Sequence, residues 1–276
     1  MVKIVIKQPT TKAVSHPVTA RLVVQMFDAI KLSSLDKEIQ DDVLRACMGD
    51  LQSRLGKCWD IWERLEVEQK RCNDEYIPSD ALGIQIPQIF GIEREVDNFL
   101  YEAKNLLRDL LNRVVSRCFP DIDFSDASSF FDSKNDGDGP FVRWAELKFG
   151  LDDDFTKMLR EDQEWIAELV RKRNSVEHPA ERSGTLTVQN IEALYDGRIV
   201  APIWQRTGTD AEFISVGMAT YCQHLLSFAE EVIIFGCIQK SALTQSITFA
   251  EIPESDRDPK CPVRYQACFK GGVIQD

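Results

Sequence analysis

The chain has 276 residues, of which 43% are hydrophobic and 28% are charged, a composition typical of a soluble globular protein and unlike that of a disordered or membrane chain. The formal net charge is −12, from 45 acidic and 33 basic residues, so the molecule repels polyanions and a general nucleic-acid binder is disfavoured. Because no leader-like segment and no apolar run of roughly 20 residues occurs, we expect a cytoplasmic protein without membrane contact.

The first half of the chain is predicted to be mainly helical. Residues 2–7 alternate between apolar and polar in the manner of a half-buried strand. Apolar residues then recur every three or four positions after Pro17, over 35–65 and over 93–118, which predicts three amphipathic helices. Prolines and glycines interrupt 76–92, so this segment is predicted to be an ordered connector.

Residues 121–140 are predicted to form a loop without a metal. The stretch DSKNDGDG has Asp132, Asp136 and Gly137 at positions where an EF-hand calcium loop requires them, but Lys134 and Arg143 occupy two other ligand positions. We therefore expect a solvent-exposed loop. The eight cysteines contain no C-x-x-C pair, which disfavours both a zinc site and a disulfide framework.

The second half is predicted to contain two further long helices and a terminal hairpin. One helix is expected from about Asp153 to His178, where Pro179 ends it. A short helical stretch is expected over 188–195, and Thr209 with Glu212 forms a capping box that opens a last helix to about Gln239. Alternation over 247–269 predicts a hairpin, joined by the N-terminal strand into a small sheet on a mainly α protein.

The stretch LVRKRNSVEHPAER contains the candidate functional residues. Steps of four from the apolar residues 165 and 166 lead to Arg173 and Asn174, so both polar side chains continue a buried stripe. A buried guanidinium needs a carboxylate or an anionic ligand. Glu177, four residues on, offers the carboxylate, and an Arg173–Glu177 pair with His178 at the negative end of the helix dipole is the structural alternative.

The functional alternative is RNA cleavage by transphosphorylation. In that reaction a base removes the ribose 2′-hydroxyl proton while a cation stabilises the charge on the phosphorane, roles suited to His178 and Arg173. Because screening acts over about 10 Å, the basic run Arg171, Lys172 and Arg173 can act locally despite the net charge. This hypothesis requires Arg173 and His178 to be accessible to solvent in a cleft.

The hexapeptide RNSVEH, Arg173 to His178, resembles the R-x4-6-H motif of the HEPN superfamily (higher eukaryotes and prokaryotes nucleotide-binding), and the helix order over about residues 93–240 is similar. The resemblance implies an HEPN-like helical bundle at 93–243, between an N-terminal strand, helical extension and connector (1–92) and a C-terminal β-hairpin tail (244–276). It also implies a homodimer with a composite active site.

The activity implied by the resemblance is that of a metal-independent endoribonuclease, without a cofactor, that leaves 2′,3′-cyclic phosphate ends. By motif position Arg173 binds the scissile phosphate, His178 is the general acid or base, and Asn174 orients one of them. Arg171, Lys172 and Glu177 are expected to contact the RNA substrate. Such proteins occur in toxin–antitoxin and defence systems, so an antitoxin or nucleotidyltransferase-like partner is expected.

One alternative function stays open, and several enzyme classes are disfavoured. Some members of the superfamily are inactive, so the alternative function is a helical scaffold or a nucleotide-binding interaction protein. His224, among apolar residues of the last helix, is expected to be a core or surface histidine without a catalytic role, and His16, before Pro17, is expected to be a loop residue. The chain has no G-x-S-x-G, P-loop or G-x-G-x-x-G motif, which disfavours serine hydrolases, P-loop nucleotide hydrolases and dinucleotide enzymes.

Overall fold

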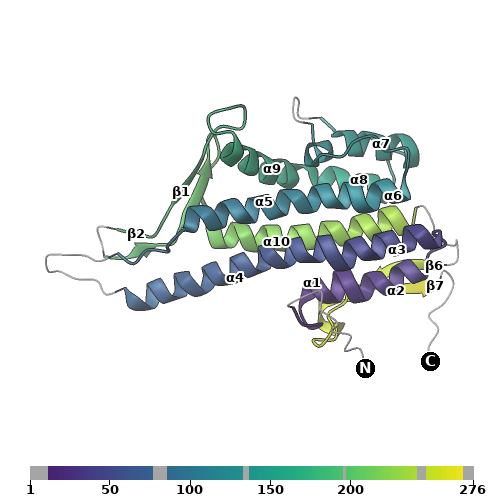
Figure 1. The fold of residues 1–276 in the computed structure, drawn as a ribbon, viewed down its shortest axis with the longest axis horizontal. Helices are drawn as coiled ribbons and strands as arrows, with labels where there is room; N and C mark the ends of the chain where they lie inside the picture. The colour runs from purple at the N-terminus through teal and green to yellow at the C-terminus, as the bar shows by residue number, and fades with distance from the viewer. Residues whose placement is uncertain (1–11, 77–85, 133–136, 195–196, 241–246, 270–276) are drawn as a thin grey trace, which may run out of the picture. The chain divides into compact units, whose positions relative to one another are not determined.

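The chain is mostly helical with a few short antiparallel sheets (Figure 1), which confirms the predicted mainly α class. A computed structural model describes residues 12–76, 86–132, 137–194, 197–240 and 247–269. Two compact units are present, each made of segments distant in sequence. Unit 1 comprises Met1–Gly56, Asn105–Gln163 and Leu225–Asp276; unit 2 comprises Lys57–Lys104 and Glu164–His224. The three sequence segments expected from the HEPN resemblance stay a prediction.

The N-terminal helices confirm the predicted apolar repeat. α1 (Pro17–Thr19), Ala20–Gln25 and α2 (Met26–Lys31) follow one another without a break, and His16 caps their start by accepting a hydrogen bond from Val18 N at 3.2 Å. α3 (Lys37–Ala46), Cys47–Leu51 and α4 (Gln52–Glu75) form the second continuous helix, whose last part belongs to unit 2. The connector predicted at 76–92 lies partly outside the described residues.

The helix predicted over 93–118 is also confirmed. It consists of α5 (Ile92–Leu110), Leu111–Val115 and α6 (Ser116–Cys118), and it ends at Phe119, whose backbone is no longer helical. Its apolar stripe is fully buried, as the 0% exposure of Phe99, Leu106 and Leu110 shows. Residues 92–104 of α5 belong to unit 2, so the polar face of this part of the helix can contribute side chains to that unit.

The region after α6 contains more helix than the sequence pattern predicts. A short turn of helix at Ala127–Phe130 lies within the predicted loop, and α7 (Pro140–Phe149) was not predicted. The helix predicted from Asp153 to His178 is broken at Asp162 into α8 (Asp154–Glu161) and α9 (Gln163–Glu177). Residues 133–136 of the acidic loop lie outside the described residues, and no metal-binding cluster occurs within the described ranges.

The helix predicted over 188–195 is wrong, because this part of unit 2 forms short strands. These strands are β1 (Leu186–Gln189), β2 (Glu192–Ala193), β3 (Ile199–Val200), β4 (Ile203–Arg206) and β5 (Glu212–Phe213). β4 lies between β1 and β5 in an antiparallel sheet, and β2 pairs with β3. Interstrand pairing satisfies the backbone here, and a single-sequence pattern does not contain that information.

The predicted capping box is likewise wrong. Thr209 Oγ1 donates to Arg206 O at 3.0 Å in the turn between β4 and β5, and Glu212 is part of β5. The last helix, α10 (Ile214–Glu231), therefore begins only after the sheet and continues through Val232–Ile238. Its predicted end near Gln239 is confirmed.

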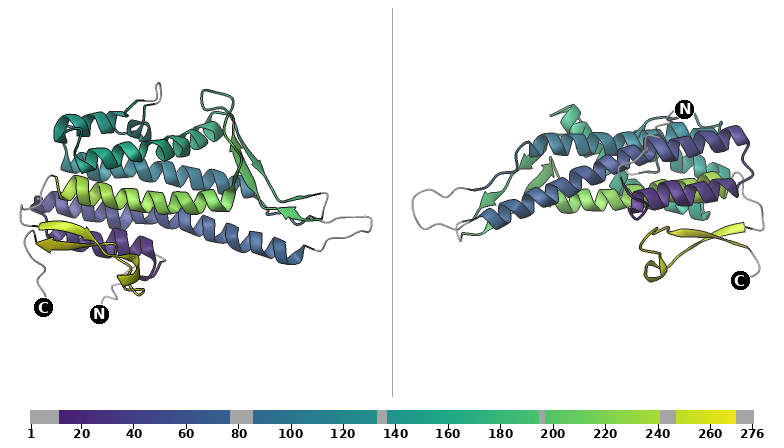
Figure 2. Two further views of the ribbon diagram at one scale, coloured as in Figure 1. Left: turned by 180° about the vertical axis from the view of Figure 1, so that it is seen from behind. Right: turned by 60° about the horizontal axis from the view of Figure 1, so that its bottom comes forward.

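The C-terminal hairpin is confirmed within unit 1. β6 (Ile247–Glu251) pairs antiparallel with β7 (Tyr265–Phe269). The hairpin, yellow in both views of Figure 2, is attached to the N-terminal helices of the same unit: Gln25 Oε1 accepts from the backbone N–H groups of Arg264 and Tyr265 at 2.6 and 2.7 Å. The strand predicted over residues 2–7 lies outside the described residues.

A buried ion pair joins the N-terminal helices of unit 1 to its C-terminal helix. Arg21 donates two hydrogen bonds to Glu230, whose side chain is fully buried, and Gln25 donates to the other carboxylate oxygen at 2.6 Å. Such a pair is tolerated in a core because both carboxylate oxygens of Glu230 accept hydrogen bonds. Among the described residues, no helix has both the length and the apolar character required to cross a membrane.

Candidate functional site at the end of α9

The last turns of α9 place the predicted site residues at very different depths. Lys172 and Arg173 are buried, with 5% and 8% exposure, whereas His178 is exposed. The helix ends there because Pro179 follows and Ala180 adopts a positive φ of 66°, in a turn closed by Ala180 N donating to Gly184 O at 3.1 Å. Arg173 therefore points inward, as the sequence pattern predicts.

The Arg173 guanidinium is held by two carboxylates of its own chain. Nη1 donates to Asp97 Oδ1 of α5 at 2.5 Å, and Nη2 donates to Glu177 Oε1 at 3.1 Å. The Tyr101 ring lies 5.5 Å from the guanidinium carbon. Nε is buried and has no hydrogen-bond partner within the described part of the chain. The Arg173–Glu177 pair of the structural alternative is thus present, with Asp97 as a further partner.

Lys104 of α5 adds a second cation to this group. Its Nζ donates to Asn174 Oδ1 at 2.9 Å and to Glu177 Oε2 at 3.1 Å. Burial tends to raise the pKa of Glu177, but the hydrogen bond and charge of Lys104, together with the charge of Arg173, outweigh burial and lower it. Glu177 is therefore an anion that bridges the two cations.

We call these five residues the α5/α9 cluster: Asp97, Lys104, Arg173, Asn174 and Glu177. Its two cations and two carboxylates balance in formal charge, so in this arrangement it offers a polyanion little net attraction. The Asp97 side chain is 48% exposed, compared with 10% for that of Arg173. The outer partner of the guanidinium is thus the one that solvent or a ligand can replace.

His178 lies directly beyond the cluster and faces solvent. Its backbone N–H continues the helical hydrogen bonding by donating to Asn174 O at 2.8 Å. The side chain is 62% exposed, and Nδ1 is 4.0 Å from Glu181 Oε1, which is too long for a hydrogen bond. The imidazole is therefore accessible to a ligand, whereas the guanidinium of Arg173 is not, so only His178 has the accessibility that the ribonuclease hypothesis requires of both residues.

Lys172 belongs to a separate network on the other side of α9. Its Nζ donates to Glu212 Oε2 at 2.8 Å and to Tyr221 OH at 3.1 Å, and lies 5.0 Å from the Trp204 ring centre. Trp204 Nε1 donates to the same Glu212 oxygen at 2.7 Å. Burial acts to lower the pKa of Lys172, but Tyr221 and Glu212 raise it overall, so the ammonium stays charged inside unit 2.

The run Arg171, Lys172, Arg173 accordingly does not form one basic surface. Successive residues of a helix point about 100° apart, so Lys172 turns toward the sheet and Arg173 toward α5. Arg171 is half-buried and makes interactions of its own. The structure brings Arg173, Asn174 and Glu177 together and directs Lys172 elsewhere.

The other two histidines have structural surroundings. His16 caps the first helix of unit 1, as described above. In unit 2, His224 packs on Trp165 with ring centres 5.3 Å apart, and burial lowers its pKa. His16 thus lies outside the helix, as expected of a loop residue, and caps the helix that follows.

The contribution of α5 to the cluster was not predicted from the sequence. Asp97, Tyr101 and Lys104 are spaced four and three residues apart, so they share one helical face. That spacing was a detectable signal, but the strong apolar stripe of the same helix indicated only a core role. The association with Arg173, 76 residues away from Asp97, needs the tertiary fold.

No protein-family model, curated protein or solved structure matches this chain. The fold and the site define a mainly helical protein with small antiparallel sheets, in which one helix ends in an ion-paired cluster beside an exposed histidine. Membership of the HEPN superfamily therefore stays a prediction from the RNSVEH motif and the helix order.

Proposed function

We propose that this protein is a metal-independent endoribonuclease of HEPN type, working at the end of α9. The observation that supports the proposal is an exposed His178 directly after the end of α9, whose last turns carry Arg173 and Asn174, with Lys104 of α5 bonded to Asn174. These residues supply a proton acceptor or donor, a forked cation and a second cation, the set that transphosphorylation requires.

In the proposed reaction His178 removes the proton of the ribose 2′-hydroxyl, and the 2′-oxygen then forms a bond to phosphorus. The bond from phosphorus to the 5′-oxygen breaks, and that oxygen takes up a proton from an acid, which in a homodimer is the imidazolium of the second copy. The products are a 2′,3′-cyclic phosphate and a 5′-hydroxyl. Arg173 stabilises the negative charge that develops on the phosphorane oxygens.

The proposal requires Arg173 to exchange partners. A phosphate oxygen would replace the half-exposed Asp97 carboxylate, while Glu177 and Lys104 keep the end of α9 in place. The unpartnered Nε favours such a rearrangement, because a buried donor without a hydrogen bond costs about 1–3 kcal/mol. Dimer formation, RNA binding or the release of an antitoxin would each allow this exchange of partners at Arg173.

The decisive assay is incubation of the purified chain with single-stranded RNA in EDTA, with analysis of the cleaved ends. We expect 2′,3′-cyclic phosphate and 5′-hydroxyl ends, and a loss of about 10²–10⁴-fold in rate for His178→Ala. Arg173→Ala should abolish cleavage as well. His224→Gln is the matched control, since that histidine lies outside the cluster, and it should cleave like the parent protein.

A second function is favoured by a different observation, the low exposure of Arg173 between two carboxylates. On this alternative the cluster is structural and the chain is a catalytically inactive helical interaction protein. RNA that stays intact with the parent protein and with Asp97→Asn, which removes the competing carboxylate, would favour this alternative. Cleavage that is faster in Asp97→Asn than in the parent would favour the enzyme.

A further inference from the structure

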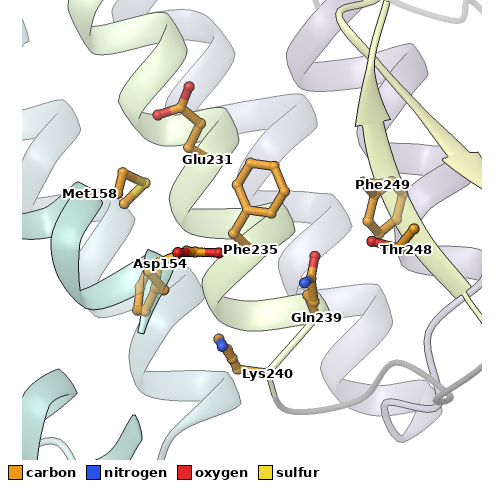
Figure 3. Close-up of a pocket in the computed structure, with 9 residues that line it drawn as sticks. Asp154, Met158, Glu231, Phe235, Gln239, Lys240, Thr248 and Phe249 are labelled. Carbon is orange, nitrogen blue, oxygen red and sulfur yellow. The ribbon is translucent and has the colours of Figure 1, made fainter. Parts of the chain in front are cut away.

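A pocket of about 380 Å³ lies within unit 1 and shares no residue with the α5/α9 cluster. Figure 3 shows Asp154 and Met158 of α8 on one side, Glu231 and Phe235 of the C-terminal helix in the centre, and Thr248 and Phe249 of β6 on the other side. The volume falls within the range of small-molecule sites, roughly 300–1,000 Å³. Neither the proposed ribonuclease nor the fold accounts for the combination of rings and carboxylates that lines it.

The charges around the pocket favour a cation. Among the described residues the lining contains one ammonium, that of Lys240, and it is already paired with Asp153. The carboxylate of Asp154 has no hydrogen bond or ion pair among the described residues. The lining therefore contains one solvent-exposed carboxylate whose charge is not paired with any cation of the described residues.

Glu231 gives the pocket a second acceptor. Its Oε1 accepts from Arg264 Nη1 at 2.7 Å and from Tyr265 OH at 3.2 Å, whereas Oε2 accepts no hydrogen bond from any described residue. Burial raises the pKa of Glu231 even though Arg264 opposes the shift. A further cation beside Oε2 would offset that cost of burial.

The remaining lining is apolar and mostly aromatic. Phe235 and Phe249 offer ring surfaces, the buried Phe155 is also part of the lining, and Met158 adds a flexible thioether. Aromatic faces attract ammonium groups and also bury hydrocarbon, so they suit an organic amine better than a metal ion, which would need more oxygen ligands.

We propose that this pocket binds a small organic amine, with its ammonium between Asp154 and Glu231 and its apolar body against Phe235 and Phe249. The site is independent of the proposed ribonuclease activity, because all its residues belong to unit 1. Asp154 lies at the start of α8, where the helix dipole also favours an acid, so its alternative role is to stabilise that helix start.

Isothermal titration of the full-length protein with three ligands of similar size tests the proposal: 2-phenylethylamine, the neutral 2-phenylethanol and the anionic phenylacetate. We expect the amine to bind at one site, the alcohol to bind about tenfold more weakly, and phenylacetate not to bind. Asp154→Asn should weaken amine binding about tenfold, and Phe235→Leu should weaken the binding of amine and alcohol alike.

Asp152→Asn is the matched control, because this neighbouring side chain is 99% exposed, and its amine affinity should equal that of the parent protein. Thermal unfolding without ligand shows whether each variant remains folded. The proposal is overturned if the alcohol binds as tightly as the amine, if folded Asp154→Asn binds the amine normally, or if millimolar amine does not bind. In the last case Asp154 serves the helix start alone.

Discussion

The strength of the ion pair between Arg173 and Asp97 determines how readily a phosphate can replace Asp97 at the Arg173 guanidinium. Fully exposed pairs contribute about 0–1 kcal/mol, whereas loss of one partner from a buried pair costs about 3–5 kcal/mol. Here the Arg173 side chain is 10% exposed and that of Asp97 is 48% exposed, so the pair lies between these limits. We expect a coupling free energy of about 1–2 kcal/mol between the two side chains.

A double-mutant cycle measures this coupling. Arg173→Gln, Asp97→Asn and the double variant are unfolded in urea, and the free energies of unfolding are compared by circular dichroism. A parallel cycle pairs Arg173→Gln with Asn98→Ala, an exposed neighbour on α5, and should give no coupling. A coupling below about 0.3 kcal/mol in the Asp97 cycle, equal to that of the control, would refute the view that Asp97 holds the guanidinium.

Three further predictions concern the buried network, a titrating histidine and a close helix contact. Glu230→Ala leaves Arg21 buried without its main partner, so we expect a loss of about 3–5 kcal/mol in the free energy of unfolding, measured in urea. Burial lowers the pKa of His224, so around the ordinary histidine pKa of about 6.5 the unfolded chain binds more protons than the folded chain. The free energy of unfolding should therefore fall as the pH decreases from about 6.5 through the lowered pKa of the folded state. His224→Gln should flatten the dependence of the urea midpoint on pH. Gly217→Ala would place a Cβ 2.6 Å from the buried Trp204 ring, and we expect a lower melting temperature, corresponding to about 1–3 kcal/mol.

Each of these predictions has an outcome that contradicts it. Unfolding of Glu230→Ala in the same range as that of the exposed control Glu254→Ala would show that Arg21 finds another partner. A nuclear magnetic resonance titration that gives His224 its ordinary pKa would remove the basis of the pH prediction. An unchanged melting temperature for Gly217→Ala would mean that the Trp204 ring moves away at no cost.

Local sequence patterns determined the long helices of this protein. Apolar residues recur every three or four positions over 93–118, which places them on one face of a helix, and this pattern predicted a core helix. Residues on that face, such as Phe99, Leu106 and Leu110, are fully buried. Pro179 similarly fixed the end of α9, because the backbone of the preceding residue is restricted. Alternation over 247–269 predicted the β6–β7 hairpin, whose two strands lie close in sequence.

The tertiary structure decided the strands of unit 2 and the partners of the site. Residues 188–195 were predicted to be helical, but pairing of β1 with β4 and of β2 with β3 places residues 188–189 and 192–193 in strands. The energy of such pairing depends on residues elsewhere in the chain.

The sequence placed Arg173 on a buried face and offered Glu177 as its carboxylate. It did not indicate Asp97 or Lys104, since electrostatic partners on another helix leave no periodic trace in a single sequence. Packing of α9 on α5 within unit 2 brings the two carboxylates and two cations together, and it leaves His178 in solvent while the guanidinium is covered.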